Sequence, residues 1–143
     1  MNETMNRSYS AIVTVMSVLL VGAIITFLLA SLLHLGIGLP LGFREPRIIP
    51  APIGEGFCGL VLKVGAYALF ARKTWAWRAV LVTHLLAIAA VLLGITALGL
   101  GAGPRTEANT IYHSIILMVL VIDLAGLSTR SAQSALGRHQ QVL

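Results

Sequence analysis

Residues 9–34 read YSAIVTVMSVLLVGAIITFLLASLLH and contain no charged side chain. A helix needs about 20 mostly apolar residues to cross the hydrocarbon of a bilayer, because it rises by about 1.5 Å per residue. The run is also longer than the apolar core of a secretory signal peptide, which has about 7 to 15 residues. It therefore predicts a membrane-spanning helix that stays in the protein.

The whole chain has the composition of a membrane protein. Of its 143 residues, 57% are hydrophobic and only 10% are charged, and the mean hydropathy is +0.91. Soluble domains carry about a quarter charged residues, so this chain lacks their polar shell. Disorder is excluded, and soluble enzyme classes are not expected. The single Cys58 excludes an internal disulfide and a CxxC redox pair.

Three further apolar runs follow, at residues 53–70, 77–100 and 109–127. Together with residues 9–34 they predict an all-α, up-down four-helix transmembrane bundle that occupies residues 1–143 as a single domain. The longest connection, residues 36–52, contains Pro46, Pro50 and Pro52, which we expect to keep it extended or turned.

The basic residues predict the orientation of these spans. With four spans both termini lie on one side, and cytoplasmic loops collect Lys and Arg. The terminal side would hold Arg7, Arg72, Lys73, Arg78, Arg130 and Arg138, and the other side Arg44, Arg47 and Arg105. We expect both termini to be cytoplasmic. The net charge of +5 is scattered rather than clustered, so nucleic acid is not an expected partner.

Small residues at helical spacing predict which faces pack together, because membrane helices associate where their backbones approach closely. The third run carries the stripe Ala76, Ala79, Thr83, Ala87, Ala90, Gly94, Ala97 and Gly101. The second carries Gly56, Gly59, Lys63, Ala66 and Phe70, and the fourth Asn109, Tyr112, Ile116, Val119, Asp123, Gly126 and Arg130. These stripes predict that Lys63 and Asp123 point inward, and that the first helix is peripheral.

Lys63, His84 and Asp123 are expected to form one buried polar layer. Asp123 is the acidic side chain at a depth comparable to that of Lys63, so we predict that the two interact, with His84 beside them. The layer is either a structural ion pair or a proton relay. A third possibility is a misplaced fourth span, which would leave Asp123 near the headgroups.

His34, Glu55 and His113 are predicted to lie together at the opposite membrane face. Two histidines and a carboxylate are able to ligate a metal, and two histidines to hold a haem, but no HxxxH or HxxE spacing supports either. No metal or cofactor is therefore expected. For Glu55 we expect an exposed ion pair with Arg44, Arg47 or Arg105. Thr106 or Asn109 is expected to cap the fourth helix.

Several short motifs carry a resemblance. Trp75, Ala76, Trp77 and Arg78 open the third helix, Gly103–Arg105 form a turn, and Asn109 is followed by Tyr112 and His113. In these stretches the chain resembles small four-helix integral membrane proteins of bacteria that are generally described as uncharacterised. The resemblance implies a bacterial multi-pass membrane protein, singles out Tyr112 and His113, and implies no activity.

No GxSxG, HExxH or Walker motif occurs, so an enzyme is not expected. The leading hypothesis is a scaffold or modulatory subunit that associates with itself or with another membrane protein. The alternative is a small proton- or solute-transporting subunit that uses Lys63, His84 and Asp123, and that requires an oligomer or a partner to enclose a pathway. A redox enzyme with haem at His34 and His113 is the third class.

Overall fold

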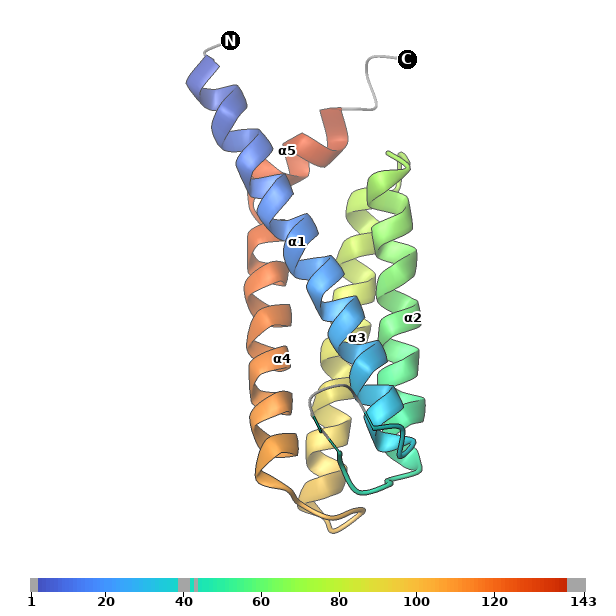
Figure 1. Cartoon of the computed structure of the whole chain (residues 1–143). Helices are drawn as coiled ribbons and strands as arrows, with labels where there is room; N and C mark the ends of the chain where they lie inside the picture. Colours follow the sequence, from blue (N-terminus) through green and yellow to red (C-terminus); the bar gives the residue numbers. More distant parts are fainter. Residues whose placement is uncertain (1–2, 39–41, 43, 139–143) are drawn as a thin grey trace.

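The computed structural model describes residues 3–38, 42 and 44–138, and the described part of the chain is helical, without strands (Figure 1). Its helices are α1 (Glu3–His34), α2 (Pro50–Phe70), α3 (Ala76–Gly99), α4 (Glu107–Leu127) and α5 (Arg130–Arg138). The first four are long and apolar enough to cross a membrane. They confirm the four spans predicted from the sequence.

The four long helices run alternately up and down and pack in a ring. α2 contacts α1 and α3, and α4 contacts α3 and α1. α1 crosses the bundle diagonally and begins at the end where α4 finishes and α5 lies, which we call the α5 end (Figure 1). The connection 100–106 and the described residues of the connection 35–49 lie at the opposite end, which we call the loop end.

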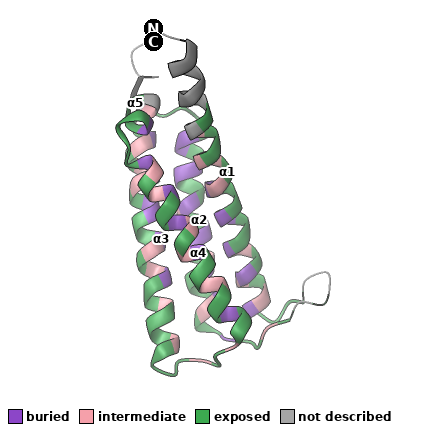
Figure 2. Ribbon diagram, turned by 90° about the vertical axis from the view of Figure 1, so that its left-hand side faces the viewer, coloured by how far each residue is buried: buried purple, intermediate pink, exposed green. Residues whose placement is uncertain are grey.

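The buried side chains line the inner faces of the helices, and exposed apolar side chains cover the outside (Figure 2). The small-residue stripe of α3 is confirmed over its first half, where Ala76, Thr83 and Ala87 are buried. Nearer the loop end the same stripe is only partly covered, and Ala97 is exposed. The packing is therefore closest toward the α5 end.

The expectation that α1 is peripheral is wrong. Its side chains Leu20, Ala23 and Phe27 are at most 2% exposed and belong to the main core cluster. α1 packs through large apolar side chains, so a search for small residues missed its inner face. Its diagonal course brings it against both α2 and α4.

α2 begins earlier than expected. Pro50 and Pro52 were predicted to lie in the connection, yet the helix starts at Pro50. The first turn of a helix tolerates proline, because the amide hydrogens there have no intrahelical partner. For α4, Thr106 is the N-cap, and its Oγ1 accepts a hydrogen bond from the Asn109 amide at 3.0 Å.

The short helix α5 was not predicted. Thr129 caps it, since its Oγ1 accepts from the Ala132 amide at 3.2 Å. Ala132 is only 1% exposed, and Leu136 packs against the main core. The segment is too polar and too short to resemble a span, so no apolar run in the sequence marks it. It covers the α5 end of the ring.

Hydrogen bonds donated by side chains tie the helices and their connections together at both ends. At the α5 end, Trp77 Nε1 donates to the Leu127 carbonyl at 3.1 Å and so joins α3 to α4. At the loop end, Ser31 Oγ donates to the Pro52 carbonyl at 2.9 Å, joining α1 to α2. Thr106 Oγ1 donates to Glu45 Oε2 at 2.9 Å and so links the two loop-end connections.

We predict that Gly65→Ala destabilises the bundle by about 1–3 kcal/mol, a typical cost of overpacking. A Cβ at Gly65 of α2 would lie 2.5 Å from Thr83 Oγ1 and 3.4 Å from the Val80 Cα of α3. Moving Thr83 aside costs its hydrogen bond to the Val80 carbonyl. Thermal unfolding in detergent measures the effect.

Gly22→Ala is the matched control, because a Cβ at this helical position meets nothing within 4 Å. Adding Thr83→Ala to Gly65→Ala removes the clashing oxygen, so the double variant should recover most of the lost stability. If Gly65→Ala melted like Gly22→Ala, the close α2–α3 approach described above would be incorrect.

Candidate functional site

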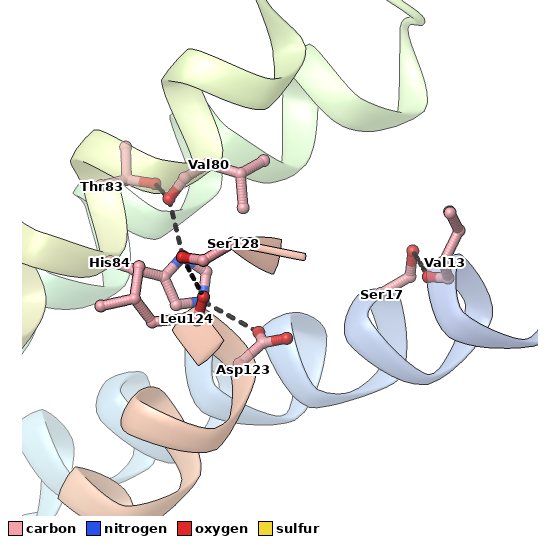
Figure 3. Close-up of polar contacts among 8 residues, drawn as sticks. All are labelled: Val13, Ser17, Val80, Thr83, His84, Asp123, Leu124 and Ser128. Atoms are coloured by element: carbon pink, nitrogen blue, oxygen red, sulfur yellow. Dashed lines mark hydrogen bonds and ion pairs between the residues drawn. The ribbon is translucent and has the colours of Figure 1, made fainter. Parts of the chain in front are cut away.

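His84 of α3 and Asp123 of α4 form a buried pair toward the α5 end (Figure 3). His84 Nε2 lies 2.8 Å from Asp123 Oδ2. The two residues are 0% and 1% exposed. The prediction that Asp123 points inward with His84 beside it is thus confirmed geometrically, and the pair joins two neighbouring helices of the ring.

The second ring nitrogen determines how protons are arranged in this pair. His84 Nδ1 lies 2.8 Å from the Val80 carbonyl, which only accepts, so Nδ1 carries a hydrogen. The Nε2–Oδ2 contact then requires a second proton, held either by the imidazole or by the carboxyl group. Both arrangements leave the pair with no net charge, which lowers its cost in a medium of low dielectric constant.

Lys63 is not part of this pair, and the predicted interaction between Lys63 and Asp123 is wrong. Lys63 is exposed on the outside of α2, and the ion pairs among the described residues involve histidine and carboxylate partners only. Lys63 and His84 do lie at similar distances from the α5 ends of their helices. Lys63 lies seven residues, about 10 Å, before the end of α2, and His84 eight residues, about 12 Å, after the start of α3.

The prediction that the Lys63 side chain points inward is wrong for a geometric reason. The buried face of α2 contains Cys58, Leu62 and Leu69, and Leu62 is 0% exposed. Consecutive helical residues are turned by about 100° from each other, so burying Leu62 turns Lys63 outward. In addition, α2 packs against α1 and α3 while α4 lies across the ring, so an inward lysine on α2 would not have been adjacent to Asp123. The three-residue polar layer therefore does not form.

At the loop end, His34 of α1 and Glu55 of α2 form a second buried pair. His34 Nδ1 lies 2.9 Å from Glu55 Oε2, and the two residues are 3% and 6% exposed. The expectation of an exposed ion pair between Glu55 and an arginine is wrong. Glu55 lies in the second turn of α2 and faces the interior, whereas Arg44, Arg47 and Arg105 are exposed.

His113 lies near this pair but does not join it. Its Nδ1 bonds the Asn109 carbonyl at 2.8 Å, within α4, and its ring meets the Tyr112 ring edge to face at 4.9 Å between centroids. His113 and Glu55 line the same cavity, which has a volume of about 320 Å³ and lies between α2, α3 and α4. Of the three residues of the predicted outer cluster, His34 and Glu55 form a pair, and His113 lines the same cavity as Glu55 without bonding to either.

The sequence identified the polar residues of this region but not the cavity beside them or their lack of hydrogen-bond partners. Four buried atoms at the loop end have no hydrogen-bond partner among the described residues, namely His34 Nε2, Glu55 Oε1, Asn109 Oδ1 and Tyr112 Oη. Asn109 and Tyr112 also line a second cavity of about 230 Å³, on the α1 side. The helical spacing of Asn109, Tyr112 and Ile116 marked their shared inner face, but no sequence pattern marked the space beside it.

The residues of this region do not gather as metal ligands. Across the described residues, no group of three or more His, Cys, Asp or Glu side chains is placed to hold a metal ion. Cys58, which lines the cavity, directs its thiol at the Ala87 carbonyl, with a distance of 4.0 Å between sulfur and oxygen.

We predict that Asp123→Leu destabilises the protein by about 1–3 kcal/mol, because it leaves the buried His84 Nε2 without a partner. Asp123→Asn should melt close to the wild type, since its amide hydrogen can donate to Nε2 of a neutral His84 whose Nδ1 bonds Val80. Thermal unfolding in detergent compares the two variants. Equal destabilisation by Asn and Leu would contradict the proton arrangement, and His84→Leu added to Asp123→Leu should relieve part of the loss.

Comparison of the chain with protein-family models, with curated proteins and with solved structures finds no match. The chain's own features are four apolar helices of spanning length and two buried histidine–carboxylate pairs, one toward each end of the bundle. By its fold the chain is a multi-pass membrane protein.

Proposed function

We propose that the chain is a non-enzymatic modulatory subunit that binds a different membrane protein through the exposed face of α2 around Lys63. The observation that carries this proposal is the position of Lys63, which is exposed to the surroundings of the bundle in the middle third of an apolar span. Charged side chains inside membrane spans almost always face a bundle interior or an aqueous cavity. An outward lysine at this depth indicates that another molecule covers it.

Lys63 is badly placed to reach water by itself. Its Cα lies about 10 Å below the nearer end of α2, at Phe70. Helical side chains lean toward the helix N-terminus, and for α2 that direction leads away from this nearer end. A lysine near the middle of a span costs about 2.5–3.5 kcal/mol in membrane insertion. A carboxylate on an adjoining helix offsets this cost.

A second copy of the chain does not supply that carboxylate. The sequence contains five acidic residues. Asp123 and Glu55 are buried against histidines, Glu45 and Glu107 lie at the loop end, and Glu3 begins α1. None of these is an accessible carboxylate at the depth of Lys63. The partner is therefore a different protein with Asp or Glu inside one of its own spans.

The surroundings of Lys63 suit such a contact. Leu60, Val64 and Tyr67 are exposed apolar side chains on the same side of α2. Lipid alone would also cover them, so they do not identify a partner. They do exclude water from a charge pair formed at Lys63, and exclusion of water strengthens the attraction between the charges.

The orientation and location of the proposed subunit follow from its basic residues. Arg72, Lys73, Arg78 and Arg130 lie at the α5 end with the start of α1, whereas Arg44, Arg47 and Arg105 lie at the loop end. The positive-inside rule then favours a cytoplasmic α5 end. Together with the resemblance noted above, this supports a location in the cytoplasmic membrane of a bacterium. In that orientation Lys63 would lie in the cytoplasmic half of the bilayer.

We predict that a photo-crosslinking phenylalanine analogue at Tyr67 forms, in cells, a discrete adduct with another membrane protein that carries Asp or Glu at this depth. Lys63→Leu should lower the yield about tenfold or more, because a charge pair worth 1.4 kcal/mol accounts for a factor of ten. Arg78→Leu is the control for loss of a positive charge, since Arg78 is exposed near the start of α3. Lys73 is unsuitable because its Nζ lies over the Tyr67 ring, 5.7 Å from the centroid. The same probe at Leu93, an exposed position on α3, controls for random collisions.

Exchanging the charges provides the decisive step. Lys63→Glu should abolish the adduct, and replacing the partner's acid by lysine should restore it. Adducts with lipid alone or with a second copy would each contradict the proposal. A yield that does not respond to Lys63→Leu would contradict it as well.

A further inference from the structure

The cavity of about 320 Å³ at the loop end is independent of Lys63 and has a lining unlike that of an ordinary packing defect. Genuinely empty cavities are apolar. Here Phe27, Val91 and Leu98 supply apolar walls, but Glu55 and Asn109 also line the space. These two residues are only 6% and 4% exposed. The cavity therefore combines an apolar body with a buried polar corner.

The polar corner contains hydrogen-bond acceptors. Among the described residues Glu55 Oε1 and Asn109 Oδ1 have no partner, and both atoms accept when the carboxyl group is ionised. His113 donates from Nδ1 to the Asn109 carbonyl, so Nε2 of its neutral ring is a third acceptor. That atom faces α3, because a Cβ on Gly94 would lie 3.6 Å from it. Gly94 lines the same cavity.

Apart from the side-chain amide nitrogen of Asn109, strong donors are scarce in this lining. The Cys58 thiol points at the Ala87 carbonyl, and thiols are weak donors. The Tyr112 hydroxyl has no partner among the described residues and is able to donate or to accept. The corner thus matches a group with several N–H bonds and a positive charge, since charge-assisted hydrogen bonds to a carboxylate are the strong ones.

We propose that this cavity binds a small primary amine with an apolar body, whose ammonium group donates to Glu55, Asn109 and His113. A primary ammonium has three donors and no acceptor, which complements three acceptors, one of which belongs to a carboxylate. A metal ion fits less well, because the described residues provide no group of three His, Cys, Asp or Glu ligands. The volume is at the lower end of the range for small-molecule sites, about 300–1,000 Å³.

The His34–Glu55 pair prepares the site for a cation. His34 Nδ1 occupies Glu55 Oε2 at 2.9 Å and leaves Oε1 available. His34 donates from Nδ1 to the carboxylate, and this bond holds the orientation of the Glu55 side chain. The exposed Arg44, Arg47 and Arg105 at this end are not part of the cavity lining.

A matched series of probes tests the proposal on the full-length protein in lipid nanodiscs. Benzylamine, benzyl alcohol and toluene share one apolar body and differ in the donating group. Binding is followed by saturation-transfer NMR and by the rise in melting temperature that a ligand specific for the folded state produces. We expect benzylamine to bind about tenfold more tightly than benzyl alcohol, and toluene to bind most weakly.

Two variants with matched controls locate the site. Glu55→Gln should lower the affinity for benzylamine about tenfold and change that for benzyl alcohol little, because it removes the charge and keeps an oxygen for His34. Glu107→Gln is its control, an exposed carboxylate at the same end of the bundle. Gly54→Leu fills the cavity, and Gly22→Leu is its control. A Cβ at either glycine meets nothing within 4 Å, so both variants should fold, and only Gly54 lines the cavity.

The possible outcomes separate clearly. Loss of benzylamine binding in Gly54→Leu but not in Gly22→Leu, together with the Glu55→Gln effect, supports the proposal. Equal binding of benzylamine and benzyl alcohol overturns the ammonium preference. The absence of saturable benzylamine binding, or binding that Gly54→Leu leaves unchanged, shows a cavity that holds only water or lipid. None of these results depends on Lys63 or on a protein partner.

Discussion

The hydrogen bond between His84 and Asp123 answers the strictest constraint on this bundle, which is a carboxylate buried among apolar helices. The lipid interior offers no water to a buried carboxylate, so a partner within the protein has to be supplied. Asp123 obtains this partner from His84 on the neighbouring helix α3, and the Val80 carbonyl fixes the orientation of the His84 imidazole. This bond sets the register of α3 against α4, and the core residues toward the α5 end pack around that register. Burying the pair is affordable because, in either proton arrangement, it has no net charge.

The sequence was sufficient for the spans and insufficient for the directions of side chains within them. Residues 9–34 predict a helix because lipid requires a continuous apolar run, and Thr106 predicts a cap through local chemistry alone. Lys63 shows the limit of such reasoning. A stripe of small residues includes it, but whether Leu62 or Lys63 faces inward depends on the volumes of the neighbouring helices. The prediction that Glu55 pairs with an arginine failed similarly. The sequence places His34 and Glu55 at the same membrane face, but they are 21 positions apart and no local spacing shows that they pair.

The two ends of the bundle differ in how closely their helices pack and in how completely their buried polar groups are hydrogen-bonded. At the α5 end, Trp77 bonds the last carbonyl of α4, and α5 covers the ring. At the loop end, the stripe on α3 continues through Gly94 and Ala97 beyond the point where neighbours cover it. The space left there is the cavity. Glu55, Asn109 and Tyr112, which each have a buried atom without a partner among the described residues, line it, and His34 lines the second cavity. Loose packing and unsatisfied polarity therefore occur together, as expected of a region shaped by something other than stability.

Lys63 and Glu55 both carry a charge within an apolar helix, but one lies on the outside of the bundle and the other in its interior. A charge inside a membrane requires a countercharge or a donor, and this chain provides Glu55 with one and Lys63 with none among the described residues. Glu55 is enclosed, so what completes it has to be small enough to enter the bundle. Lys63 is on the outside of a helix, so its complement can be a whole protein. The size of each expected partner thus follows from where the fold places the charge, and the two proposals stand or fall separately.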